Sequence, residues 1–79
     1  MQLPVIKLLA ETYTKEQLRE AENTLYEEQQ PKINIEGKDE GEQLTHVLAA
    51  ISILEDVEKG TELRMAIRNY TQRVRNSIS

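Results

Sequence analysis

The stretch from Gly37 to Gly60 reads GKDEGEQLTHVLAAISILEDVEKG, and it decides the fold of this chain. After an acidic first turn it becomes a run of apolar residues at helical spacing. On a helical wheel these residues form two adjacent stripes that together cover more than half of the circumference. The first stripe comprises Leu44, Val47, Leu48, Ile51 and Leu54, and the second comprises Ala50, Ile53 and Val57. A helix with so wide an apolar arc needs neighbours on two sides, within the chain or from another molecule.

The sequence also marks where this helix begins and ends. Asp39 followed by Glu42 is typical of a helix start, where acidic side chains meet unpaired backbone N–H groups. Gly60 suits the left-handed position that closes a helix. Gly60 and Thr61 form a short connection to the last helix, which predicts that this helix turns back as an antiparallel neighbour of the central helix. That helix carries a narrow apolar stripe of Leu63, Ile67, Tyr70, Val74 and Ile78.

The N-terminal half predicts two shorter helices. Residues 3–13 have helical spacing and Pro4 at the start, where its missing N–H costs nothing, although the β-branched residues there leave a strand as the competing interpretation. Thr14 and Gln17 form a capping-box pattern for a helix over residues 15–29. Pro31 must lie outside that helix.

Residues 31–38 read as an ordered loop, in which Ile33 and Ile35 alternate with polar residues and can pin the chain to the core. We therefore predict a single all-α domain over residues 1–79. It is a small bundle of three to four helices with an antiparallel C-terminal helix pair and an ordered loop at 31–38.

The small size of the chain suggests self-association. Its 79 residues include no Cys and only three aromatic residues, all Tyr, so no disulfide stabilises it. Small domains without such a staple often gain stability by forming oligomers. Because the arc of the central helix is so wide, we expect a non-enzymatic interaction or structural module that forms a homodimer through this helix. The candidate interface residues are Ala50, Ile53, Val57 and His46.

His46 is the sole histidine, and Glu42 lies one helical turn before it. Side chains at this spacing point together and can share a metal ion, so a weak metal site is one hypothesis. Two ligands are too few for a structural metal centre, and we predict no bound metal. We favour a boundary histidine that is bonded to Glu42 or to a backbone carbonyl, and a pH-sensitive interface is a further interpretation.

Charge is distributed unevenly within the net value of −4. Residues 1–58 hold 13 acids and 5 bases, whereas residues 59–79 hold five bases and only Glu62 as an acid. Arg64, Arg68 and Arg75 share one flank of the last helix, which gives an alternative function as a nucleic-acid accessory protein. The acidic chain and a basic flank without aromatic side chains for base stacking argue against nucleic acid as the partner.

Several classes of protein are disfavoured. With one histidine, no cysteine and no buried acidic pair expected, the chain has no nucleophile beside a base, so we expect no enzyme and no cofactor. Gly37 and Gly41 are too few to form a phosphate-binding loop. No apolar run approaches ~20 residues, so no membrane span is expected. With no signal peptide visible, the predicted location is the cytoplasm.

Three segments resemble a family of short, uncharacterised bacterial proteins. They are Leu3-Pro4-Val5-Ile6-Lys7, the run Asp39 to His46 reading DEGEQLTH, and the run Tyr70 to Asn76 reading YTQRVRN. Together they cover about a quarter of the chain. The resemblance implies a small bacterial helical protein, and it implies no activity or ligand.

Overall fold

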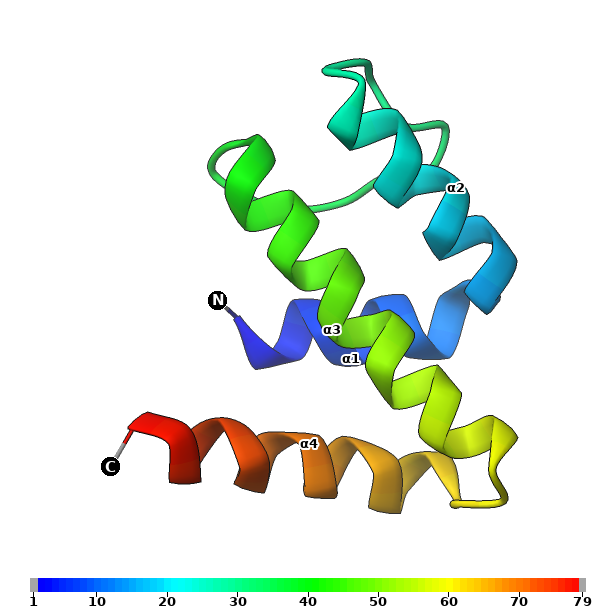
Figure 1. The fold of residues 1–79 in the computed structure, drawn as a ribbon, viewed down its shortest axis with the longest axis vertical. Coiled ribbons are helices and arrows are strands. Elements are labelled where there is room, and N and C mark those ends of the chain that lie inside the picture. The colour runs from blue at the N-terminus through cyan, green and yellow to red at the C-terminus, as the bar shows by residue number, and fades with distance from the viewer. Residues whose placement is uncertain (1, 79) are drawn as a thin grey trace.

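The fold is all-α. The computed structural model describes the backbone of residues 2–78 and the side chains of residues 2–76. Over that range it has no strand and four helices: α1 (Leu3–Thr12), α2 (Lys15–Tyr26), α3 (Glu40–Glu58) and α4 (Leu63–Ile78) (Figure 1). The predicted small bundle, its ordered loop and the reversal of direction between α3 and α4 are confirmed. The side chain of Ile78, predicted to extend the stripe of α4, lies outside the described residues.

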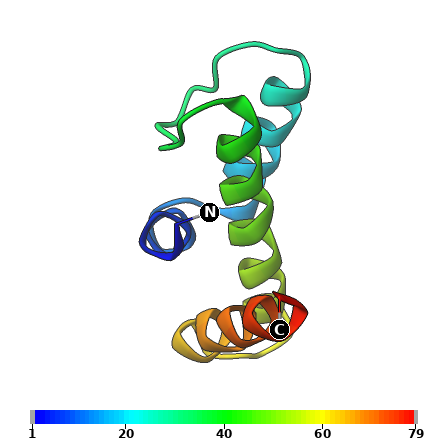
Figure 2. The same ribbon diagram turned by 90° about the vertical axis from the view of Figure 1, so that its left-hand side faces the viewer.

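The long helix α3 is the centre of the molecule. Each of the other three helices packs against α3, while the other helix pairs have little or no contact over the described residues. Figures 1 and 2 show α2 beside α3, α1 crossing its middle on another side, and α4 crossing obliquely near its C-terminal end. The wide apolar arc of α3 is therefore met by three neighbours from the same chain.

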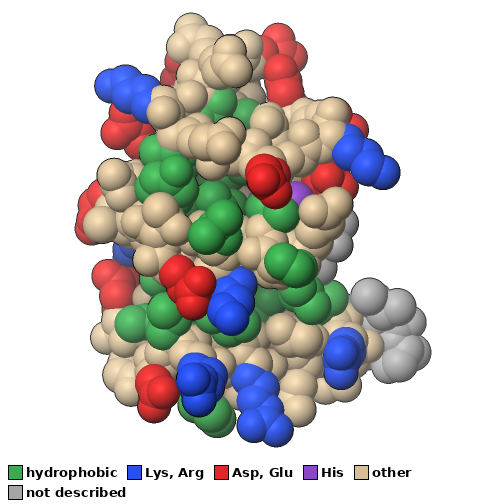
Figure 3. Space-filling model, turned by 180° about the vertical axis from the view of Figure 1, so that it is seen from behind, with side chains coloured by type: hydrophobic (Ala, Val, Ile, Leu, Met, Phe, Trp, Pro, Cys, Tyr) green, Lys and Arg blue, Asp and Glu red, His purple; other side chains and the backbone are tan. Residues whose placement is uncertain are grey.

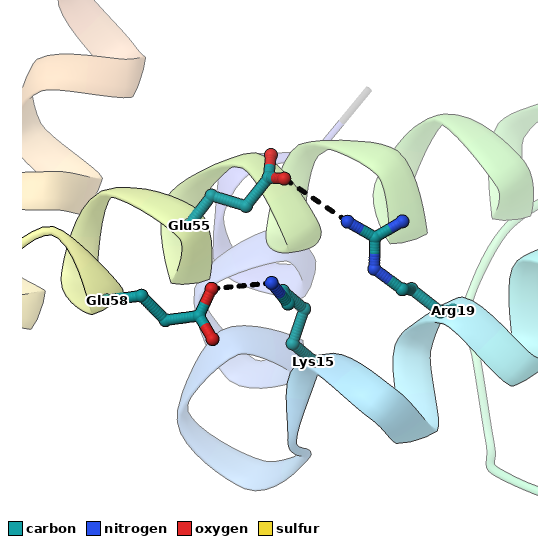
Figure 4. Close-up of polar contacts among 4 residues, drawn as sticks. All are labelled: Lys15, Arg19, Glu55 and Glu58. Atoms are coloured by element: carbon teal, nitrogen blue, oxygen red, sulfur yellow. Dashed lines mark hydrogen bonds and ion pairs between the residues drawn. The ribbon is translucent and has the colours of Figure 1, made fainter.

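Polar contacts identify the three sides of α3. Arg19 of α2 pairs with Glu55 at 3.2 Å, and Lys15 pairs with Glu58 (Figure 4). On another side, His46 is bonded to the residue that precedes α1. On the side towards α4, the Asp56 carboxylate forms an ion pair with the guanidinium of Arg73 at 3.3 Å. The surface pairs on α2 contribute less than about 1 kcal/mol each, so the buried apolar contacts hold the bundle together.

The predicted helix starts of α2 and α3 are confirmed in atomic detail. The hydroxyl of Thr14 accepts from the N–H of Gln17 at 3.2 Å, and the Gln17 side chain accepts from the N–H of Thr14 at 2.9 Å. At α3, the carboxylate of Asp39 accepts from the N–H of Glu42 at 2.8 Å. Both caps satisfy backbone donors that a helix cannot pair internally.

α3 and α2 end in the same way but with different residues. After α3, Gly60 has φ of 106°, and its N–H and that of Thr61 bond back into the last turn, which confirms the predicted stop. After α2, Glu28 takes this position with φ of 59°, and the N–H of Gln29 bonds to the carbonyl of Thr24. The helix therefore ends at Tyr26, three residues before the predicted end.

The loop between α2 and α3 is fastened to the core. Ile35 is buried and Ile33 is half-buried. The side-chain amide of Gln43 donates to the carbonyl of Ile35 at 2.9 Å. A methyl group at Gly37 would meet the backbone nitrogen of Gln43 at 2.8 Å, so only glycine allows this approach. The loop is thus a structural part of the domain, as its two isoleucines predicted.

Candidate interaction surface

The interface residues predicted from sequence are not a free surface in this fold. Ala50, Ile53 and His46 have no exposed area in a single chain, and Val57 is half-buried. The prediction counted the second stripe of α3 as uncovered, whereas most of it is buried within the single chain. In the folded chain α1 and α4 both pack against α3, and Ala50 and Ile53 belong to its buried core.

His46 joins three segments of the chain. Its Nδ1 lies 2.8 Å from the carbonyl oxygen of Glu36, and its Nε2 lies 3.0 Å from the backbone nitrogen of Gln2. A carbonyl can only accept and an N–H can only donate, so these partners fix a neutral ring with the proton on Nδ1. The ring thereby ties the start of α1 and the end of the loop to α3.

The hypothesis of a metal site at Glu42 and His46 is not supported by this geometry. The lone pair of Nε2 is occupied by the Gln2 N–H, and Nδ1 carries a proton that it donates to Glu36. The carboxylate of Glu42 accepts from the backbone N–H of Lys38 at 3.0 Å. Among the described side chains, no three His, Asp or Glu residues gather as metal ligands would. The alternative interpretation, a histidine bonded to a backbone carbonyl, agrees with the observed contacts of His46.

The three arginines of the predicted basic flank lie on α4. Arg64, Arg68 and Arg75 are exposed on α4, and none of them has an acidic partner within ion-pair distance among residues 2–76. Arg73 differs, because it pairs with Asp56 and lies 5.7 Å from the centre of the Tyr70 ring. The three flank arginines therefore carry positive charge that the described chain does not neutralise locally.

A groove between α1 and α4 borders this flank. Its lining comes from both helices and from Glu62, which lies just before α4. The lining residues are Lys7, Glu11, Glu62, Leu63, Arg64 and Ile67. Leu63 and Ile67 are only half-buried, and Ala66 is the one side chain of α4 in residues 63–76 that is fully buried. Seen from behind in Figure 3, apolar side chains continue between the middle and the lower part of the molecule, where basic side chains gather.

Comparison with known proteins supplies a family and no activity. One family description matches residues 1–79, namely a family of unknown function, DUF6952. The chain belongs to this family. Neither the curated proteins nor the solved structures gave a significant match. Within the described residues, no helix has the length and apolar character needed to cross a membrane.

Sequence reasoning found the arginines but missed the groove. It predicted that α4 lies beside α3, and it gave Lys7 no role. The groove exists because α4 presents only one edge of its stripe to α3, which leaves Leu63 and Ile67 partly open towards α1. No local signal marks this, because the two walls are more than fifty residues apart in the chain.

Proposed function

We propose that this protein is a non-enzymatic module that binds another polypeptide, and that the groove between α1 and α4 is its binding surface. The observation that carries the proposal is the half-buried apolar stripe of α4 beside three arginines that have no acidic partner among residues 2–76. Partly open apolar strips with a charged rim are typical of protein-binding sites. A helix in such a groove would cover the edge of α4 that α3 leaves open.

The polar groups of the core support a non-enzymatic role. The sole histidine has both ring nitrogens engaged with backbone groups. Among the described residues, no buried side-chain nitrogen or oxygen lacks a hydrogen-bond partner. A histidine whose two ring nitrogens are both engaged by the backbone is not free to exchange a proton with a substrate, which supports a non-enzymatic role.

Affinity capture from the native host tests the proposal. The bait is compared with a double variant, Arg64→Glu and Arg68→Glu, and with a charge-matched control, Lys32→Glu and Lys38→Glu. All four residues are exposed, so the fold should persist in each variant. The proposal predicts a protein that is retained by the wild type and the control and lost from the groove variant. Retention by all three baits at equal yield would refute the groove as the binding surface.

A second candidate function is self-association through the part of α3 that its neighbours leave open. Leu48 is 41% exposed there, and Leu44 and Ser52 on either side of it are half-buried. A two-fold dimer could cover this strip, which differs from the stripe that the sequence suggested. Sedimentation velocity at micromolar concentration tests it. Leu48→Glu should convert a dimer to a folded monomer, and a monomeric wild type at these concentrations would end this candidate.

A further inference from the structure

The flank arginines define a line along α4. Arg64 and Arg68 are one turn apart and Arg75 follows after two further turns, so all three fall on one side of the helix. At 1.5 Å per residue the line from Arg64 to Arg75 spans about 16 Å. A partner helix of roughly three turns is long enough to run beside it.

The groove beside this line is apolar along the wall that α4 provides. Leu63 and Ile67 contribute that wall, and both pack against the core on one side while remaining partly open on the other. On α1, Leu3 is 39% exposed and precedes Lys7 by one turn. Glu11 and Glu62 lie where α1 ends and α4 begins, so the positive surplus lies further along, at Arg68 and Arg75.

We infer that this groove binds an acidic amphipathic helix of a different protein, an inference that rests on the proposed binding function. The apolar stripe of such a helix would cover Leu63 and Ile67, and carboxylates along one edge would meet the three arginines. Charge complementarity of this kind speeds encounter and selects the partner. The spacing of four and seven residues between the arginines sets the spacing of the matching acids.

Charge also argues against a second copy of the chain in this groove. In a two-fold contact the same surface faces itself, so the arginine flanks of the two copies would approach each other. Like charges placed opposite one another oppose association. A hetero-partner with acids on its edge avoids this repulsion and supplies counter-charge to the arginines.

Two other anionic partners fit the surface less well. A nucleic acid would use the arginines but not the apolar wall, and Tyr70, the aromatic residue of α4, is half-buried beside Arg73. A lipid surface needs an apolar face turned outward. On α4, Met65 is the exposed large hydrophobic residue among those described, whereas Leu63 and Ile67 face the core and the groove.

Binding of designed peptides tests the inference. The probe is a labelled peptide of about 15 residues with leucines on one face and glutamates on one edge. A second peptide carries lysine for glutamate, and a third has the same composition in shuffled order. We expect micromolar binding of the acidic peptide alone, weakened by salt because exposed ion pairs are screened. Reversing Arg64, Arg68 and Arg75 to glutamate should weaken binding about tenfold or more.

The matched control reverses Lys32, Lys38 and Lys59, which are also exposed, and gives the same net charge. Its affinity for the acidic peptide should stay near that of the wild type, and circular dichroism should show both variants folded. The inference fails if the acidic peptide does not bind, if the shuffled peptide binds equally, or if both triple variants lose binding to the same extent. Tighter binding of single-stranded RNA or of anionic vesicles at the same flank would also overturn it.

The outcome for the proposed function is separable from this test. If groove-dependent capture from the host succeeds while the acidic peptides fail, the module binds a partner of different chemistry. If both experiments fail, the groove is not a binding surface.

Discussion

The backbone N–H of Gln2 donates a hydrogen bond to Nε2 of His46 over 3.0 Å, although 44 positions separate the two residues. The same ring donates from Nδ1 to the carbonyl of Glu36 at 2.8 Å. A buried polar ring is stable in a core only when its nitrogens are paired, and here the backbone pairs both. His46 is therefore a structural residue that fixes where α1 begins relative to α3.

This pairing predicts the tautomer of His46. Long-range ¹H–¹⁵N correlation spectra should place the proton on Nδ1, because Nε2 must accept from Gln2. His46→Ala should lower the free energy of unfolding by about 2–4 kcal/mol through the lost bonds and the cavity. His46→Phe keeps a ring of similar size, so the loss that persists in this variant measures the hydrogen bonds. A proton found on Nε2 would contradict the assigned geometry.

The left-handed helix stop at Glu28 predicts opposite effects of glycine substitution at two neighbouring positions. Glu28→Gly should stabilise the protein by about 0.5–1 kcal/mol, because a side chain is strained at positive φ. Glu27→Gly removes the same charge at a residue with φ of −85°, and it should destabilise by about 0.5 kcal/mol. Urea midpoints of the two variants measure the difference. If both urea midpoints shifted equally in the same direction, the lost charge and not the backbone conformation would determine the change in stability.

Burial on α3 predicts different costs for two apolar residues on the same helix. Ile53 is fully buried, so Ile53→Ala should cost about 2–5 kcal/mol of unfolding free energy. Leu48 is 41% exposed, and Leu48→Ala should cost less than about 1 kcal/mol. Urea unfolding followed by circular dichroism compares them. A dimer interface at Ile53 would instead show as loss of association with an unchanged monomer stability.

Local chemistry was readable from sequence at several points of the fold. The capping box of Thr14 and Gln17, the cap of Asp39 and the stop at Gly60 depend on residues close together in the chain, and all three are present. The early end of α2 was missed, because glutamate has no preference for the conformation that Glu28 adopts. That conformation depends on how the following loop returns to the core.

Locating the proposed binding surface required information that periodicity does not contain. The pattern of Leu63 and Ile67 shows which side of α4 is apolar, but it does not say how much of that side α3 will cover. Likewise, the width of the apolar arc on α3 indicated that several neighbours pack against it, but not whether they belong to the same chain. Ala50 and Ile53 therefore read as an interface and proved to be core.

The sequence by itself determined the helices of this protein, most of their ends, the fastening of the loop and the basic flank of α4, because each arises from interactions within a few turns of one segment. Only the tertiary structure decided which faces meet. Crossing positions of helices are set by the packing of side chains from distant segments, and these positions buried His46 and Ile53 while leaving a groove between α1 and α4.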